Sequence, residues 1–167
     1  MMLGNLGSWW KGFASGLGIQ PAANERPIKE AQLQVGTDLT ALDVVLRWFE
    51  QFNAAPLSCE EWWECETALV EAFTNAVRHA HGHLPQTAPI ELEVIVFGHC
   101  LEMKIWDRGG PFDLEAYIEE LLKKPLDPWE IGHKGLRIMK ELTDELYYRR
   151  TADGRNCLLM RKRLAGE

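Results

Sequence analysis

The sequence lacks the long apolar run that a membrane-spanning helix requires. Such a helix needs roughly 20 consecutive apolar residues, and the most apolar stretch, Met1–Ala22, is interrupted by Lys11 and by several glycines. No basic segment precedes an apolar core in this stretch, so we expect no secretory signal peptide. These absences predict a cytoplasmic protein without a transmembrane segment.

Positive charge is also in short supply. The 167 residues include 25 acidic and 18 basic side chains, for a formal net charge of −7. Nucleic-acid-binding domains are usually basic, so this class of function is disfavoured and we expect no nucleic-acid partner. A single nucleotide remains a possible ligand, because a metal ion and backbone amides can hold its phosphates.

The four cysteines form no CxxC pair and no spacing typical of a disulfide framework; they are Cys59, Cys65, Cys100 and Cys157. We therefore expect buried, reduced thiols, as in most cytosolic proteins. The fingerprints GxGxxG after a strand and GxxxxGK[ST] are absent as well, which disfavours the common dinucleotide-binding and P-loop folds.

The composition that is present, 46% hydrophobic and 26% charged, fits one globular domain. Its expected extent is 27–164, between an N-terminal tail, 1–26, and a short C-terminal tail, 165–167. Apolar residues recur at helical spacing within the N-terminal tail: Leu6, Trp9, Trp10, Phe13 and Leu17. Either this is a short amphipathic helix that docks on a partner, a second subunit or a membrane surface, or its glycines leave it a loosely packed tail.

Hydrophobic periodicity and capping signals predict five strands and four helices. The strands are expected at 28–35, 90–97, 101–106, 145–151 and 155–164, and three of the helices at 39–53, 59–81 and 112–124. The fourth helix is expected within 131–144, which begins as a loop. The last four strands come in two hairpins, so the sheet should be mostly antiparallel. The predicted fold class is α+β, a two-layer sandwich with helices covering one face of the sheet.

Three short segments combine polar and small residues in a way that suggests a ligand site. Glu71 and Asn75 are one helical turn apart and share a face. Asp107 follows a strand and precedes paired glycines in DRGGPFD, where a ligand could approach the backbone closely. GHKG, from Gly132, opens a helix whose N-terminal amides would suit an anion. Taken singly, each segment is equally compatible with ordinary surface residues, turns and caps.

Two other clusters are less persuasive. In HAHGH, His79 and His81 would point to nearly opposite sides of a helix, so we expect no shared metal ion, and His79 is expected near the ligand pocket. The basic end of the last strand, RKRL at 161–164, is expected to face solvent.

In combination, these segments resemble the GHKL ATPase family. The resemblance rests on ExxxNAxxHA, on DxGGPFD, and on Gly132 and Gly135 ahead of a helix that runs into DEL. The closest branch is that of the small anti-sigma-factor serine/threonine kinases, and the resemblance extends over Ile28–Leu164. It implies a Bergerat-type ATP-binding fold, ATP and Mg²⁺ as cofactors, and a homodimer.

The resemblance also implies roles for the matching residues. Glu71 would be the general base that takes a proton from the attacking hydroxyl, and Asn75 would be the Mg²⁺ ligand. Asp107 would accept the adenine amino group, and Gly109 would let adenine lie against the backbone.

The lid over the phosphates would end at Gly132 and Gly135, with Lys134 as a further phosphate contact. This segment departs from the family pattern, because His133 occupies a position that is usually glycine. The departure leaves two functions open. One is a protein serine/threonine kinase that uses ATP and Mg²⁺ to phosphorylate a small antagonist protein, with a sigma factor competing for the kinase. The alternative is a nucleotide-binding regulatory module that holds a partner without phosphoryl transfer.

Overall fold

A five-stranded sheet forms the centre of the protein. The computed structural model describes residues 25–125, 127–128 and 134–166, so the expected docking helix of the N-terminal tail, Gly132 and His133 lie outside the described residues. The strand order is β1-β2-β3-β5-β4, and all four neighbouring pairs are antiparallel. The strands are β1 (Lys29–Val35), β2 (Ile90–Val96), β3 (Cys100–Asp107), β4 (Glu145–Arg150) and β5 (Asn156–Arg163).

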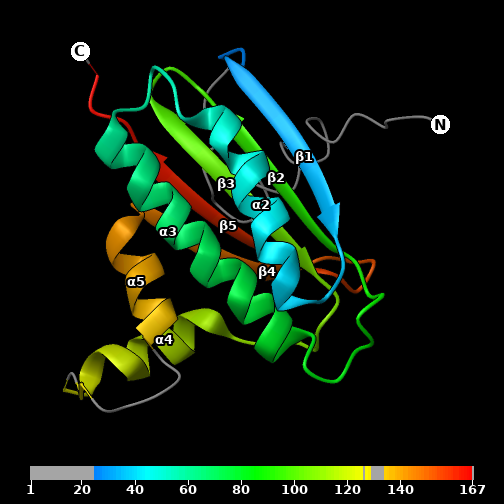
Figure 1. Ribbon diagram of the computed structural model, residues 1–167. Coiled ribbons are helices and arrows are strands. Elements are labelled where there is room, and N and C mark those ends of the chain that lie inside the picture. Colours follow the sequence, from blue (N-terminus) through cyan, green and yellow to red (C-terminus); the bar gives the residue numbers. More distant parts are fainter. Residues whose placement is uncertain (1–24, 126, 129–133, 167) are drawn as a thin grey trace.

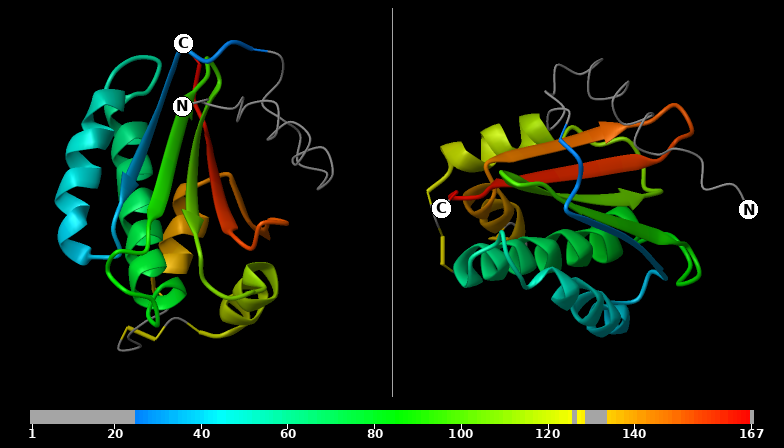
Figure 2. Two further views of the ribbon diagram at one scale, coloured as in Figure 1. Left: turned by 90° about the vertical axis from the view of Figure 1, so that its right-hand side faces the viewer. Right: turned by 90° about the horizontal axis from the view of Figure 1, so that it is seen from above.

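Helices pack against one face of this sheet, which confirms the predicted α+β sandwich (Figures 1 and 2). The helices on this face are α2 (Leu42–Phe49), α3 (Cys59–Asn75) and α5 (Lys134–Leu142), and the fourth α-helix is α4 (Leu114–Lys123). Helix α3 lies along the middle of the sheet, with α2 on one side of it and α5 on the other (Figure 1). Helix α4 instead contacts β4. Within the described ranges, no helix has the length and apolar character needed to cross a membrane.

Helix α3 begins where the sequence predicts. The hydroxyl of Ser58 accepts a hydrogen bond from the amide of Glu61, and the Glu61 carboxylate accepts one from the Ser58 amide, which completes a capping box. Leu69 and Phe73, both fully buried, then contribute to a core shared with inner residues of the sheet such as Met103. This packing positions the polar face of α3 relative to the end of β3.

The second half of the predicted helix 59–81 differs from expectation. Regular α-helix ends at Asn75, and Ala76–Ala80 form a single π-helical turn. Such turns insert an extra residue and shift the side chains that follow, and they are frequent at functional sites. Here the turn directly follows Asn75.

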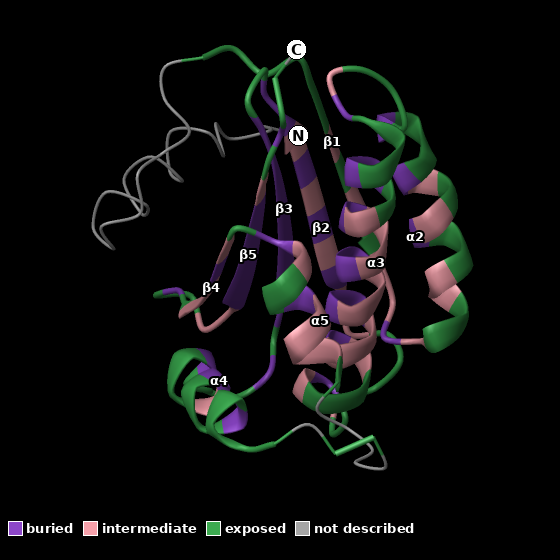
Figure 3. Ribbon diagram, turned by 90° about the vertical axis from the view of Figure 1, so that its left-hand side faces the viewer, coloured by how far each residue is buried: buried purple, intermediate pink, exposed green. Residues whose placement is uncertain are grey.

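Strands β3 and β5 are more buried than a sheet covered on one face should allow. Strand β2 alternates between buried and half-buried residues, whereas every residue of β3 is buried (Figure 3). The expectation that 161–164 faces solvent is therefore wrong at Arg161, which is 7% exposed and ion-paired with Glu102 at 2.7 Å. The expectation of buried thiols holds for three cysteines, whereas Cys59, in the first turn of α3, is exposed.

A buried histidine connects three segments near the end of β3. The Thr37 hydroxyl donates to the Ala88 carbonyl, so it accepts from Nδ1–H of His81 at 2.8 Å. The other ring nitrogen, Nε2, accepts from the backbone amide of Arg108 at 2.7 Å. Both nitrogens are thus committed to one neutral tautomer, and the imidazole fixes the backbone next to Asp107.

Burial lowers the pKa of His81 from its usual 6.5, and the charges of His83 and Arg108 act in the same direction, against the opposing effect of Asp107. The unfolded chain therefore binds a proton at a higher pH than the folded protein does. The stabilisation from neutral His81 is fully present above about pH 6.5 and is lost as the pH falls towards the lower pKa of the folded state.

We predict that the free energy of unfolding of the wild type decreases between pH 7 and pH 5, and that His81→Asn shows a weaker decrease. At pH 7.5 the variant should be less stable by roughly 1–3 kcal/mol, because buried partners lose their hydrogen bonds. Urea titrations across the pH range measure both effects. The matched control His79→Asn, at an exposed position, should keep the wild-type pH dependence; an unchanged dependence in His81→Asn would contradict the assignment.

Candidate functional site

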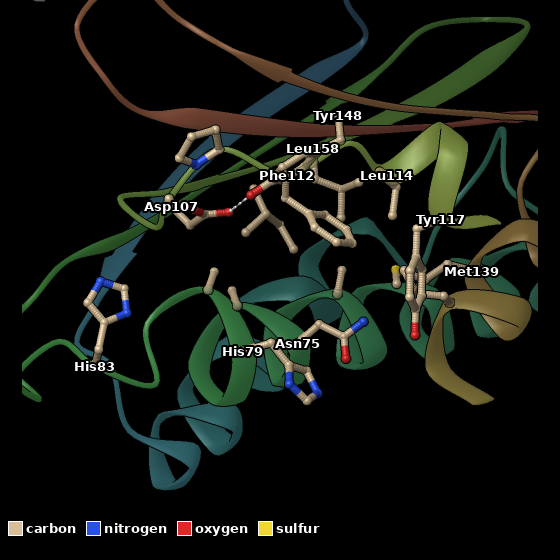
Figure 4. A pocket seen from close by; sticks show the side chains of 17 residues that line it. Asn75, His79, His83, Asp107, Phe112, Leu114, Tyr117, Met139, Tyr148 and Leu158 are labelled. Atoms are coloured by element: carbon tan, nitrogen blue, oxygen red, sulfur yellow. Dashed lines mark hydrogen bonds between the residues drawn. The ribbon is translucent and has the colours of Figure 1, made fainter. Parts of the chain in front are cut away.

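A cavity of about 430 Å³ lies between α3 and the sheet. One side is formed by the face of α3 that carries Asn75 and His79, and the other by the inner ends of β3, β4 and β5 (Figure 4). The loop after β3, from Gly110 to Phe112, and residues of α4 and α5 close the remaining sides. The cavity therefore brings together two of the three segments that the sequence singled out, the α3 face and the DRGGPFD loop.

Asp107 provides the buried charge of this cavity. Its side chain points inward from the last residue of β3 and the residue is 3% exposed. One carboxylate oxygen, Oδ1, accepts from the Gly109 amide at 2.9 Å and from Nδ2 of Asn156 at 2.8 Å. The other oxygen, Oδ2, accepts from the Tyr148 hydroxyl at 2.9 Å. These donors hold the carboxylate in one orientation and compensate for its removal from water.

Tyr148 keeps its proton under all ordinary conditions. Burial and the adjacent charge of Asp107, which also accepts its hydrogen bond, both raise the pKa of Tyr148. The hydroxyl proton is committed to Asp107, so the phenolic oxygen can offer only acceptor capacity to a ligand. The closed end of the cavity is consequently rich in acceptors, which favours a ligand group that donates hydrogen bonds.

Aromatic and aliphatic side chains make up most of the remaining wall. Phe112 lies edge-on to Tyr148, with ring centroids 6.2 Å apart, and 5.5 Å from the ring of Tyr117. Ile105, Leu158 and Met139 line the cavity as well (Figure 4 labels the last two). A flat, apolar ring with a hydrogen-bond donor at one edge fits these surroundings.

Gly135, in the first turn of α5, contacts the polar face of α3. A Cβ atom at this position would lie 2.5 Å from Oε2 of Glu71 and 3.6 Å from Oδ1 of Asn75. Only glycine allows such an approach without displacing the carboxylate. Glu71, Asn75 and the N-terminal end of α5 are therefore adjacent. Both polar residues are half-buried.

Gly109 and Lys134 have surroundings that the sequence did not indicate. A Cβ atom at Gly109 would lie 2.7 Å from the carbonyl oxygen of Ala80, so this glycine is required by the close packing of the loop against the end of the α3 segment. Gly110 lines the cavity instead. The ammonium group of Lys134 is 2.9 Å from the Pro128 carbonyl and is exposed.

Sequence reasoning missed Tyr148 and Asn156, the two side chains that hold Asp107. The signal for Tyr148 was present in ELYYRR, because alternation places it on the same face as Leu146. Asn156 pairs directly with Asp107 across β3 and β5. Without the strand order, no sequence pattern shows that these residues meet.

Comparison with known proteins agrees with the geometry of the site. Residues 35–162 match the family described as the histidine kinase-like ATPase domain. Curated relatives include the serine-protein kinase RsbW of Listeria monocytogenes, 31% identical over 102 residues, which cover 58% of this chain and 64% of the relative. RsbW of Bacillus pumilus is 33% identical over 92 residues, 52% of this chain and 57% of the relative. The matched region thus spans less than two thirds of these relatives.

Two solved structures share the fold. The RsbU and RsbW domains of Rv1364c from Mycobacterium tuberculosis superpose with a TM-score of 0.57 at 15% identity, covering 83% of this chain and 32% of that one. The SiaB–SiaC complex from Pseudomonas aeruginosa gives a TM-score of 0.51 at 12% identity, covering 98% of this chain and 100% of its counterpart. The family match covers most of the described fold and confirms the GHKL resemblance: the chain belongs to the histidine kinase-like ATPase domain family.

Proposed function

We propose that the cavity binds ATP and that the chain is a protein serine/threonine kinase of the anti-sigma-factor type. The observation that carries this proposal is the buried carboxylate of Asp107 in a mostly apolar cavity, with Asn75 and Glu71 on the adjoining face of α3. Such a site has one end suited to a purine and the other suited to phosphates.

Adenine fits the closed end by shape and by hydrogen bonding. Its ring system is flat and apolar on both faces, like the space between the Phe112 side and the α3 side of the cavity. Its 6-amino group donates hydrogen bonds, whereas guanine carries an acceptor oxygen at the same position. Since Asp107 and Tyr148 present acceptors there, adenine should be preferred over guanine.

The phosphates would lie near Asn75, Glu71 and the N-terminal end of α5. The amide oxygen of Asn75 is a suitable ligand for Mg²⁺, a hard cation that takes oxygen ligands and retains several waters. When bound, Mg²⁺ neutralises charge on the phosphate oxygens. The free amides at the start of α5 and the close approach of Gly135 allow backbone donors to reach an anionic group. Lys134 and the lid residue Gly132 remain proposed phosphate contacts.

Glu71 would act as the general base. A substrate hydroxyl attacks the γ-phosphorus, its proton passes to the Glu71 carboxylate, and the bond between the γ-phosphorus and the β,γ-bridging oxygen breaks to release ADP. Phosphoryl transfer depends mainly on positioning and charge neutralisation, so a single carboxylate within reach of the hydroxyl is sufficient. Gly135 restricts where this carboxylate can lie.

The names of the relatives support a protein as the substrate. The curated relatives are named serine-protein kinases, and the resemblance implies a small antagonist protein as the phosphate acceptor. A sigma factor would then compete with the antagonist for the kinase, and a homodimer would be the working assembly. The proposed location of the protein is the cytoplasm.

We predict that Asp107→Asn weakens ATP binding by roughly 10–100-fold, the effect of losing a hydrogen bond to a charged acceptor. The donors of Gly109 and Asn156 should keep the new amide oxygen in place, which turns the amide nitrogen towards Tyr148 and the base. GTP should gain relative to ATP, because guanine offers an acceptor there. Calorimetry with both nucleotides measures the change.

The control is Asp38→Asn, which leaves an equally good N-cap residue outside the cavity and should bind ATP as the wild type does. If the wild type binds ATP and GTP with equal affinity, and Asp107→Asn changes neither affinity, Asp107 does not recognise adenine.

We predict that Glu71→Gln slows transfer of the γ-phosphate to an antagonist protein by about 10²-fold or more, the usual loss for a general base, while ATP affinity stays within a few-fold. Radiolabelled ATP and the antagonist-type protein from the same genome provide the assay. Glu66→Gln, on the same helix, should retain activity. If the wild type binds ATP and an antagonist yet transfers no phosphate, the chain is the nucleotide-dependent binding module instead.

A further inference from the structure

The face of the sheet opposite α2 and α3, here called the outer face, is buried at its centre. Alternation along the central strands places on it Cys100, Glu102, Lys104 and Trp106 of β3 and Cys157, Leu159 and Arg161 of β5, each less than 9% exposed. Their sequence neighbours, such as Met103 and Met160, belong to the core under α3. The outer face is therefore a second buried layer, separate from that core.

Long charged side chains on the outer face are almost completely removed from water. Glu102 is 1% exposed and Lys104 is 2% exposed. Glu102 pairs with Arg161, and Lys104 pairs with Glu93, both at 2.7 Å. On an open sheet, such side chains extend their charged ends into solvent. Their burial in pairs is the arrangement expected beneath a cover, where an unpaired charge would be costly.

The described helices do not supply this cover. Helices α2, α3 and α5 pack on the opposite face, and α4 lies beside β4 (Figure 2). Within 25–125, 127–128 and 134–166, no helix lies over the centre of the outer face. Among the described side chains, the guanidinium of Arg155 lies over the ring of Trp106, 4.8 Å from its centroid, and covers that end of the outer face. The rest of the cover must come from the remaining part of this chain or from another molecule.

The chain N-terminal to Glu25 is positioned to provide it. The Glu25 carboxylate is 2.9 Å from Nδ1 of His99, in the turn between β2 and β3 and next to Cys100 at one end of the outer face. Twenty-four residues precede Glu25, and Lys11 is their only charged side chain. As a helix, 6–17 would extend about 18 Å, which is shorter than the ~26 Å of an eight-residue strand.

We propose that residues 1–24 pack their apolar side chains against the outer face of the same chain's sheet, over β3 and β5. The side chains at helical spacing are Leu6, Trp9, Trp10, Phe13 and Leu17. They match an apolar strip formed by Trp106, Cys157, Leu159 and the half-buried Tyr147. Tethering at Glu25 holds the segment at a high effective concentration, which favours its own sheet over a second copy.

Cysteine alkylation tests this proposal, because Cys100 and Cys157 lie on the outer face while Cys65 lies in the core under α3. In the full chain, Trp9→Gln combined with Trp10→Gln and Phe13→Gln should raise the alkylation rates of Cys100 and Cys157 by about tenfold or more, as local opening becomes easier. Cys65 should remain slow. Trp63→Gln, which removes an exposed tryptophan from α3, should change neither outer-face rate.

A photo-crosslinking amino acid in place of Tyr147, in an otherwise unchanged chain, provides a second measurement that does not depend on the stability of the triple variant. A mixture of isotopically light and heavy protein distinguishes crosslinks within one molecule from crosslinks between two. Crosslinks from position 147 into residues 1–24 of the same molecule support the proposal. Unchanged thiol rates in the triple variant would overturn it. So would mixed-isotope crosslinks alone, which would make a second copy the cover.

Discussion

The buried carboxylate of Asp107 is the constraint on which the site depends. A charge that is 3% exposed must be compensated by donors, and these come from three places: the loop after β3, β4 and β5. The same loop is held by His81 through the amide of Arg108. The end of the α3 segment, the ends of three strands and the first turn of the loop are thereby fixed relative to one another.

This network also explains why the cavity presents acceptors at its closed end. The donors of Gly109 and Asn156 are used on Oδ1, and the proton of Tyr148 is used on Oδ2. None of these protons remains for a ligand, whereas both Oδ2 and the phenolic oxygen can accept a further bond. The acceptor character of this end of the cavity thus arises from how the protein satisfies its own buried charge.

Helix α3 links the two ends of the proposed nucleotide site. Its capping box and its apolar contacts with the sheet position Glu71 and Asn75, and the π-helical turn that follows brings Ala80 against Gly109. Gly135 is in turn packed against Glu71. Gly109 therefore allows the loop after β3 to approach the end of the α3 segment, and Gly135 allows the start of α5 to approach Glu71 on α3. A side chain at Gly109 would meet the backbone of Ala80, whereas one at Gly135 would displace the Glu71 carboxylate.

The sequence by itself determined the α+β class and the strand and helix order, and it singled out Glu71, Asn75, Asp107 and Gly135 as candidate site residues, because periodicity, capping residues and motif spacing are local properties. Tertiary structure alone decided the rest. Tyr148 and Asn156 reach Asp107 only through the order β3-β5-β4, and His81 reaches Arg108 only through the path of the chain after α3. Arg161 and Glu102 meet only because β3 pairs with β5. Each of these features joins residues far apart in the chain, and the free energy of satisfying a buried polar group is determined by the partners that the fold supplies.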